Sequence, residues 1–297
     1  MEINELNNKF ATAGRIAFRQ SAQGTAEAVL VNGYGSCEIS LYGGRILNYR
    51  PMGHTPALFT DSESTHPEEK PICGGIPLYW PWVGSSPAEK LPRHGFARLM
   101  RWDVLSASCD SITSEITLGL SKTEESLKMW PYSFELIQKI SLTDNLSVEV
   151  TTVNKGSTPF EISQSIHPFF KLRDITQTKV IGLENIGYTN LLTGNKSVQN
   201  GPFSIDKETY LIYSAKNQSC ALRESGTGRS ILIATDGADK MIVWNPWDNK
   251  TETPEGFQND AYRKMIVVAP AHTADAPVTL KPAESITIKT AIQIMLS

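Results

Sequence analysis

The chain has 297 residues, of which 40% are hydrophobic, so it is long enough to bury a sizeable core. Lys and Arg number 28 against 31 for Asp and Glu, a net charge of -3, which argues against a general nucleic-acid or anionic-lipid surface. No apolar run approaches the roughly 20 residues that span a bilayer, and the first residues lack the regions of a signal peptide. We expect a cytoplasmic protein with no nucleic-acid or membrane partner.

The predicted elements are mostly strands. A short helix is expected near the start, where Ile3, Leu6 and Phe10 recur at helical spacing. Apolar residues then alternate with polar ones in several half-buried antiparallel strands, within residues 112–120, 134–142, 146–150 and 286–294. Thr143, Asp144 and Asn145 lie between two of these segments and predict a hairpin turn.

Three continuous apolar runs, residues 231–234, 241–244 and 265–269, are too short for core helices and indicate strands covered on both faces. Residues 61–71 and 85–92 are predicted as surface loops, and a helical turn or two is expected within 255–264.

Strands at intervals of roughly 8 to 12 residues, without alternating helices, are typical of an all-β protein built as a large antiparallel β-sandwich or barrel. No linker divides the chain, so residues 1–297 are expected to form one domain, and we expect a monomer. The four cysteines, which form no CxxC pair, are expected to be reduced.

Four segments carry unusual residue combinations. They are GGIPLYWPW at 74–82, PRHGFAR at 92–98, SIHPFF at 165–170 and VWNPW at 243–247. Proline stiffens the two Trp/Pro segments, and the indole offers a flat face with one donor, which suits a carbohydrate ring. The alternative is that these tryptophans fill the core or seal a loop, because tryptophan is highly buried on average.

The second segment concentrates donors. Arg93, His94 and Arg98 suit sugar hydroxyls or a phosphate, or else form an exposed basic loop that neutralises nearby glutamates. His167 follows a strand pattern and precedes Pro168, which restricts it to extended geometry. Its imidazole is a candidate positioned acid, with a hydrogen-bonded structural histidine as the alternative.

Several common chemistries have no motif in this sequence. There is no dinucleotide-binding or Walker loop, no nucleophile elbow and no HExxH helix. The five histidines are too dispersed for a metal motif. We therefore expect neither a cofactor nor a metal.

In their order along the chain, the four segments resemble the aldose 1-epimerase superfamily, in particular its hexose-6-phosphate mutarotase (glucose-6-phosphate 1-epimerase) branch. The resemblance spans about residues 71–270. It implies a galactose-mutarotase-like supersandwich and a small-molecule sugar or sugar phosphate as partner. It also implies acid/base catalysis in which the sugar ring opens at C1, rotates and closes.

The resemblance assigns roles to residues. It implies that His167 is the acid and that His94 and Arg98 contact substrate hydroxyls or phosphate. Arg93, Trp80, Asn245, Trp247 and Asp239 are further candidates for substrate binding.

Two positions depart from the family pattern. Relatives usually carry a catalytic Glu before the proline of the late apolar strand, where this chain has Ala269. Relatives that act on phosphorylated sugars commonly have Arg before the Gly-Gly, where this chain has Cys73. A replacement base is open between Asp239, Asp260 and His94 acting through a water.

Three functions follow from these observations. The first is an epimerase of a hexose or hexose 6-phosphate with His167 and His94 in its site. The second is a sugar-binding protein that has lost turnover, which Ala269 and Cys73 favour. The third is a structural or partner-binding sandwich whose tryptophans belong to the core.

Overall fold

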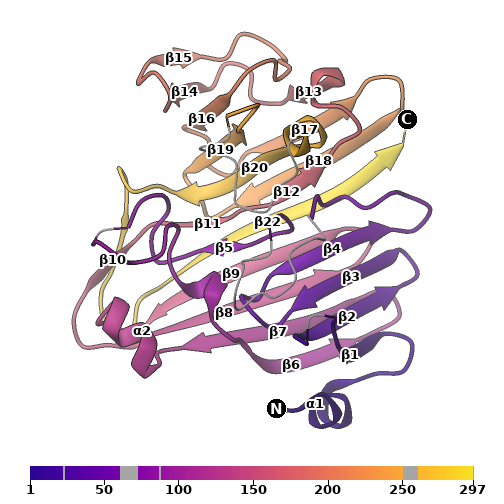
Figure 1. Ribbon diagram of the computed structural model, residues 1–297, viewed down its shortest axis with the longest axis vertical. Helices are drawn as coiled ribbons and strands as arrows, with labels where there is room; N and C mark the ends of the chain where they lie inside the picture. Colours follow the sequence, from indigo (N-terminus) through magenta and orange to yellow (C-terminus); the bar gives the residue numbers. More distant parts are fainter. Residues whose placement is uncertain (23, 61–72, 87, 250–259, 297) are drawn as a thin grey trace.

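The computed structural model describes residues 1–22, 24–60, 73–86, 88–249 and 260–296. Three antiparallel sheets account for most of this chain (Figure 1). The N-terminal sheet has the order β1-β2-β3-β4. Its strands are β1 (Ile16–Gln20), β2 (Ala26–Asn32), β3 (Gly35–Ser40) and β4 (Ile46–Pro51).

The long sheet has eight strands in the order β13-β17-β18-β22-β9-β8-β7-β6. They are β13 (Thr178–Ile181), β17 (Ser219–Glu224), β18 (Arg229–Asp236), β22 (Ser285–Leu296), β9 (Leu146–Asn154), β8 (Phe134–Leu142), β7 (Ser114–Ser121) and β6 (Asp103–Cys109).

The site sheet has the order β15-β14-β16-β19-β20-β11-β5, and β12 also pairs with β20. Its strands are β15 (Lys196–Val198), β14 (Gly187–Asn190), β16 (Thr209–Tyr213), β19 (Lys240–Asn245), β20 (Met265–His272), β11 (Gln164–Ile166), β5 (Leu78–Tyr79) and β12 (Phe169–Lys171). A small two-stranded sheet joins β10 (Phe160–Ile162) to β21 (Val278–Leu280).

Helices are few and short. They are α1 (Ile3–Phe10), α2 (Glu124–Met129) and 3-10 turns at Ala97–Leu99, Ile175–Gln177 and Ala261–Lys264. No helix within the described ranges is long and apolar enough to cross a membrane. The four cysteines are free thiols, as predicted.

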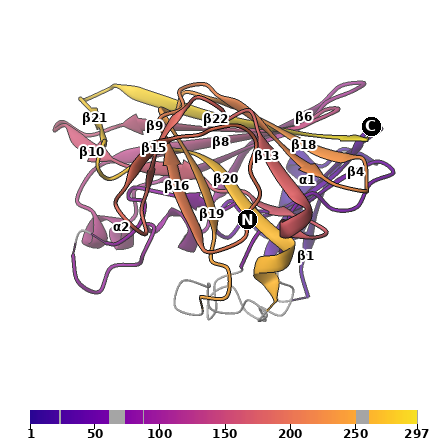
Figure 2. The same cartoon turned by 90° about the horizontal axis from the view of Figure 1, so that it is seen from above.

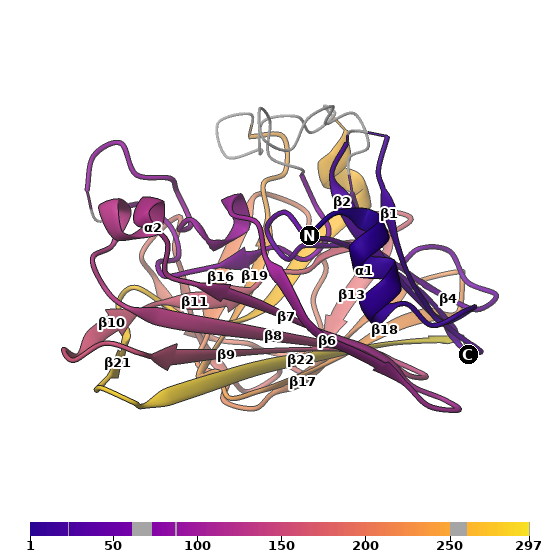
Figure 3. The same cartoon turned by 90° about the horizontal axis from the view of Figure 1, so that it is seen from below.

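The sheets pack in two layers. The N-terminal sheet and the site sheet both contact the long sheet, the first through β2 and β3 and the second through β11 and β20. One continuous core joins side chains of all three sheets, such as Ile39, Ile140 and Val268. Figures 2 and 3 show β8, β9 and β22 in one layer and β16 and β19 in the other. The predicted all-β sandwich is confirmed.

Local patterns explain most of the strands. Alternate residues of β8 and β9 are buried, and the register Leu142 to Leu146 places the predicted turn between them. Every residue of β20 is buried, as the continuous apolar run predicts. The helix at the start is confirmed as α1, and the expected turn within 255–264 is seen at Ala261–Lys264, its earlier part lying outside the described residues.

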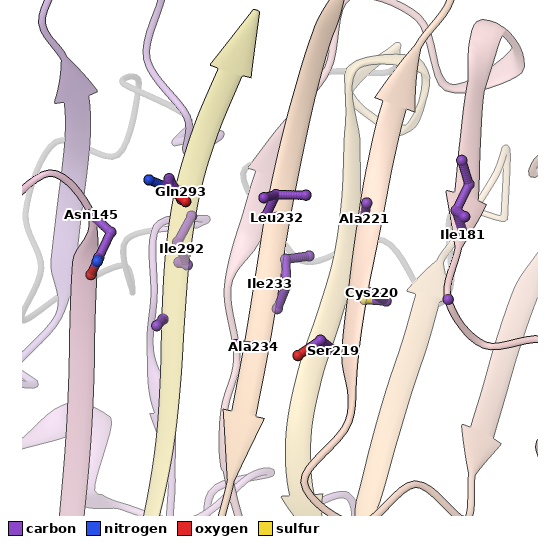
Figure 4. A pocket seen from close by; sticks show the side chains of 12 residues that line it. Asn145, Ile181, Ser219, Cys220, Ala221, Leu232, Ile233, Ala234, Ile292 and Gln293 are labelled. Carbon is purple, nitrogen blue, oxygen red and sulfur yellow. The ribbon is translucent and has the colours of Figure 1, made fainter. Parts of the chain in front are cut away.

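One prediction needs correction, and one helix was not predicted. Residues 231–234 are not covered on both faces, because Ile231 and Ile233 are buried while Ala234 is exposed. The open face of β18 lines a groove of about 510 Å³ together with β17 and β22 (Figure 4). The helix that was not predicted is α2, which lacks an apolar helical pattern and begins at a capping box between Thr123 and Ser126. The predicted loop at 61–71 lies outside the described residues.

One backbone contact ties the PRHGFAR segment to β5. Gly95 bridges to Trp80, and the Trp80 carbonyl accepts hydrogen bonds from Phe96 and Ala97 at 3.0 and 3.3 Å. Gly95 has a φ of +72°, and a Cβ added there would lie 1.9 Å from the Trp80 carbonyl oxygen. Only glycine permits this approach.

We expect Gly95→Ala to lower the free energy of unfolding by about 3 kcal/mol or more, because the backbone must move apart. Gly14→Ala is the matched control, since Gly14 has a φ of +71° and nothing within 4 Å of an added Cβ. It should cost only about 1 kcal/mol. Urea unfolding measures both, and equal losses would contradict the role given to this contact.

Candidate functional site

The candidate site lies on the outer face of the site sheet. Alternation along the strands points Leu78, Ile166 and Val268 into the main core. The opposite face carries a second cluster of side chains, which we call the site face. It comprises Tyr79, Val83, Phe169, Tyr210, Ile212, Ile242, Trp244, Met265, Val267, Ala269 and Ala271.

Tyr79 brings the two predicted histidines together. Its ring is stacked on His94 with centroids 4.1 Å apart and an interplanar angle of 19°. It also contacts the ring of His167, with centroids 4.4 Å apart at 33°. Two segments more than 70 residues apart in sequence therefore meet at one aromatic ring.

The backbone fixes the protonation state of His94. The amide N–H of Gly84 donates to Nδ1 of His94 over 3.0 Å, and the His94 amide donates back to the Gly84 carbonyl. Nδ1 therefore carries no proton, and the neutral ring holds its hydrogen on Nε2. Burial, with repulsion from Arg93 and Arg98, lowers the pKa of His94 to about 3. His94 is an uncharged donor at neutral pH.

His167 is held at the end of β11 and is only 6% exposed. Its amide N–H donates to the Pro77 carbonyl at 3.0 Å, and Ser165 Oγ lies 3.3 Å from its Nδ1. Burial is the main cause that lowers the pKa of His167 well below its usual value, and its proximity to the His94 imidazole adds to the shift. The imidazole is therefore neutral at neutral pH, and it can accept a proton or share its own.

The strand register identifies the neighbour of His167. β20 pairs with β11 at Ser165 and Ala271, and with β12 at Phe169 and Val267. Continuing this register through the intervening residues places His167 opposite Ala269. Side chains that face each other in this way have Cβ atoms about 4.5–5.5 Å apart. By this extended register, position 269, where the resemblance implies a carboxylate, is the cross-strand neighbour of His167.

Ala269 lies on an apolar floor. It is 0% exposed, and it pairs on its other side with Ile242 of β19. Among the described residues, no carboxylate stands in the row from Ile212 through Ile242 and Ala269 to His167.

Arg98, in the PRHGFAR segment, interacts electrostatically with Tyr79. It lies in the 3-10 turn Ala97–Leu99, and its Nη2 donates to the Arg93 carbonyl at 2.9 Å. Its buried Nε has no hydrogen-bond partner among the described residues. Burial lowers the pKa of Arg98, and the nearby Tyr79 opposes this shift. Arg93 is exposed, at the rim of the segment.

Both tryptophans of the first segment belong to the core. Trp80 is 0% exposed and packs edge-on against Phe96 and Trp130, so it does not reach the site face. Trp82 is buried, and its Nε1 donates to the Pro92 carbonyl at 2.9 Å. The alternative that these tryptophans fill the core or seal a loop describes both residues.

Asn245 has a backbone role. Both of its amide hydrogens are used by carbonyl groups, of Tyr262 and Met265 at 2.8 Å each, and its oxygen accepts from the Trp247 amide. Its side chain is fully buried. Trp247 is partly buried and contacts the ring of Tyr262. Trp244, rather than its two neighbours, points to the site face.

Asp239 lies on the other side of the sheet. Extending the pairing of Lys240 with Ala271 places Asp239 opposite His272, and its charge opposes the lowering of the pKa of His272 by burial. Since Ala271 faces the site, His272 and Asp239 face away from it. Asp260 is bound to Lys264 Nζ at 2.7 Å. Neither carboxylate is brought to His167.

The groove on β17, β18 and β22 does not compete for this role. Cys220 is the one side chain in its lining with a titratable group, and burial raises the pKa of that thiol to about 12. No group of three or more His, Cys, Asp or Glu within the described ranges could hold a metal ion.

Comparison with known proteins adds the family. The model of the family described as "Aldose 1-epimerase" matches residues 27–293. The chain belongs to the aldose 1-epimerase family.

Two curated relatives carry the same name, "Putative glucose-6-phosphate 1-epimerase". The one from Cenchrus ciliaris is 30% identical over 271 residues, covering 87% of this chain and 82% of that protein. The one from Escherichia coli K12 is 24% identical over 249 residues, covering 82% and 81%. Among solved structures, a "putative mutarotase" from Salmonella typhimurium superposes with a TM-score of 0.88 at 20% identity, covering 99% of both chains. That likeness shows that the fold is shared.

Sequence reasoning missed three residues of this aldose 1-epimerase family member. Tyr79 alternates with Leu78 and Trp80, so the strand period alone places it on the opposite face from them. Ser165 stands two residues before His167, on the same face by the same rule. Arg45 carries no local signal, because only the packing of the turn before β4 brings it near Tyr79.

The buried imidazoles predict an acid-sensitive fold. The pKa values of His94, His167 and His272 fall on folding, so the unfolded chain binds more protons below its histidine pKa of 6.5. The free energy of unfolding should be unaffected by these histidines above that pH. It should decrease as the pH falls from 6.5 toward 3, by up to about 1.4 kcal/mol per pH unit for each histidine.

Urea unfolding at a series of pH values tests this, with His94→Gln as the comparison. The variant should have a slope shallower by about 1 kcal/mol per pH unit between about pH 6 and 5. An unchanged slope would show that His94 is not held neutral.

Proposed function

We propose that the chain binds a hexose or hexose 6-phosphate on the site face and interconverts its anomers by ring opening, with His167 as the proton-transfer group. The observation that supports this most is the contact of Tyr79 with both imidazoles. It joins two separate segments at one face in a chain of the aldose 1-epimerase family.

Each group has a role in this proposal. Tyr79, held between the two imidazoles, and the indole of Trp244 are aromatic groups of the site face beside which a sugar ring packs. Nε2–H of His94 donates to a sugar oxygen, and Arg98 with Arg93 at the rim contacts hydroxyl or phosphate groups. His167 gives a proton to the ring oxygen as the C1–oxygen bond breaks, and the proton that leaves the C1 hydroxyl replaces it on the imidazole through water.

The second proton transfer is the slow step of the proposed reaction. The C1 hydroxyl must lose a proton, and the side chain opposite His167 is a methyl group. A water molecule takes the place of the carboxylate, and the loss of a positioned base typically slows such a step by about 10² to 10⁴. The proposed catalysis is therefore slow.

A second candidate is a sugar-binding protein without turnover. The position of Ala269 opposite His167 favours it. A neutral imidazole on an apolar floor is also a poor acid, and the pKa of His167 is lowered. Both candidates share the same binding face and differ in whether protons are exchanged with the sugar.

Anomer exchange by NMR separates the two candidates. With glucose and glucose 6-phosphate, we expect exchange above the spontaneous rate that His167→Ala reduces to that rate. His54→Ala is the matched control, because His54 lies in the turn after β4 and belongs to no contact described for the site. Saturable sugar binding without acceleration would support the second candidate, and the absence of binding would contradict both.

Restoring the carboxylate is an independent test. Ala269→Glu places an anion about 5 Å from His167, which should raise the pKa of the imidazole and increase exchange by about tenfold or more. Ala234→Glu adds the same charge on the exposed face of β18 and should change neither quantity. NMR titration of His167 and anomer exchange measure the two effects.

An Ala269→Glu variant that folds and binds sugar but exchanges no faster than the parent would contradict the role given to His167. Denaturant unfolding is needed alongside, because the substitution places a charge in a fully buried position.

A further inference from the structure

Arg45 is a buried arginine that the proposed chemistry has not used. It follows the Gly43–Gly44 turn before β4, and it is 5% exposed. Its Nη1 donates to the Gly74 carbonyl at 3.0 Å, beside Cys73. The side chain thus reaches the segment that precedes β5.

The turn that carries Arg45 is packed on the segment that carries Arg98. The Gly43 amide donates to the Met100 carbonyl at 2.7 Å, and a Cβ added at Gly43 would lie 2.5 Å from the Arg98 carbonyl oxygen. Two guanidinium groups from distant parts of the chain are therefore brought to the same neighbourhood.

Both cations interact electrostatically with Tyr79. Burial lowers the pKa of Arg45 to about 10, Tyr79 and Cys73 oppose that shift, and the charge of Arg98 adds to it. Tyr79 and Cys73 likewise oppose the lowering of the pKa of Arg98 by burial. Two like charges in a buried setting are costly unless an anion or hydrogen bonds compensate them. The Nε of Arg98 still lacks a hydrogen-bond partner within the described ranges.

We propose that Arg45 and Arg98 together bind the phosphate of a hexose phosphate whose ring lies beside Tyr79, and that Arg45 determines the preference for the phosphorylated sugar. Guanidinium forks match phosphate oxygens in geometry as well as charge. Position 73, where the resemblance implies an arginine, is a cysteine without a positive charge. Arg45 supplies a positive charge to the same segment from the turn before β4. This inference rests on the proposed function, since it deepens the identity of the sugar.

Calorimetric titration of the full chain with glucose 6-phosphate, glucose and inorganic phosphate tests the inference. We expect Arg45→Gln to weaken the binding of glucose 6-phosphate and of inorganic phosphate by about 10- to 100-fold, because charge-assisted hydrogen bonds are lost. Glucose affinity should stay the same. Arg50→Gln is the control for net charge, because Arg50 is exposed on β4.

A second variant returns a guanidinium to the place where Arg45→Gln removes one. Since Arg45 and Cys73 are electrostatic neighbours, the double variant Arg45→Gln/Cys73→Arg relocates the guanidinium within the same neighbourhood. It should recover most of the affinity for glucose 6-phosphate relative to glucose. Circular dichroism and urea unfolding establish that each variant is folded.

The outcomes distinguish this inference from the proposed function. If the parent binds glucose 6-phosphate no more tightly than glucose, or if Arg45→Gln is folded and keeps the preference, the inference is overturned while sugar binding stands. If neither sugar binds, the proposed function fails. Inorganic phosphate binding that depends on Arg45 would then still support the anion site, and its absence would overturn it.

Discussion

The site depends on the way β5 is held by backbone hydrogen bonds on both sides. One side pairs with β11 through Tyr79 and Ser165, and continues to the bond from the His167 amide to Pro77. The other side binds the PRHGFAR segment through the Trp80 carbonyl and the close approach of Gly95. With both neighbours fixed to the same two-residue strand, the imidazoles of His94 and His167 meet at the ring that β5 presents.

The chemistry of this face is set by what surrounds the imidazoles. His94 receives a backbone N–H and is uncharged, and His167 stands over apolar side chains with a methyl group as its cross-strand neighbour. The charges near them are guanidinium groups, whose attraction is for anions. Neutral imidazoles beside cationic groups are consistent with the proposed binding of an anionic sugar and with slow proton transfer.

The sequence was most informative where a single strand period decides the outcome. The sandwich, the hairpin at Thr143–Asn145 and the buried β20 all follow from alternation or continuity of apolar residues. The meeting of His94 with His167 was expected from the resemblance of their motifs, and the structure shows the contact with Tyr79 that joins them.

Long-range packing limits how much of the site can be predicted from the sequence. Trp80, Asn245 and Asp239 lie in conspicuous motifs, yet the register turns each of them away from the site face. Arg45 has an ordinary sequence context, and it becomes important only because a Gly-Gly turn packs against another loop. Such placement cannot be seen in residue spacing, because it depends on contacts between segments far apart in sequence.

The pairing of β20 has a consequence for how such a protein can change over evolution. The main chain of β20 is bonded to strands on both sides, so replacing the side chain at position 269 leaves its ladder intact. β5 differs, because Leu78 and Trp80 support the core while Tyr79 between them supports the site. Substitutions on β20 can therefore change the reactivity of the site without disturbing the fold. Substitutions on β5, two strands away, are constrained by folding itself.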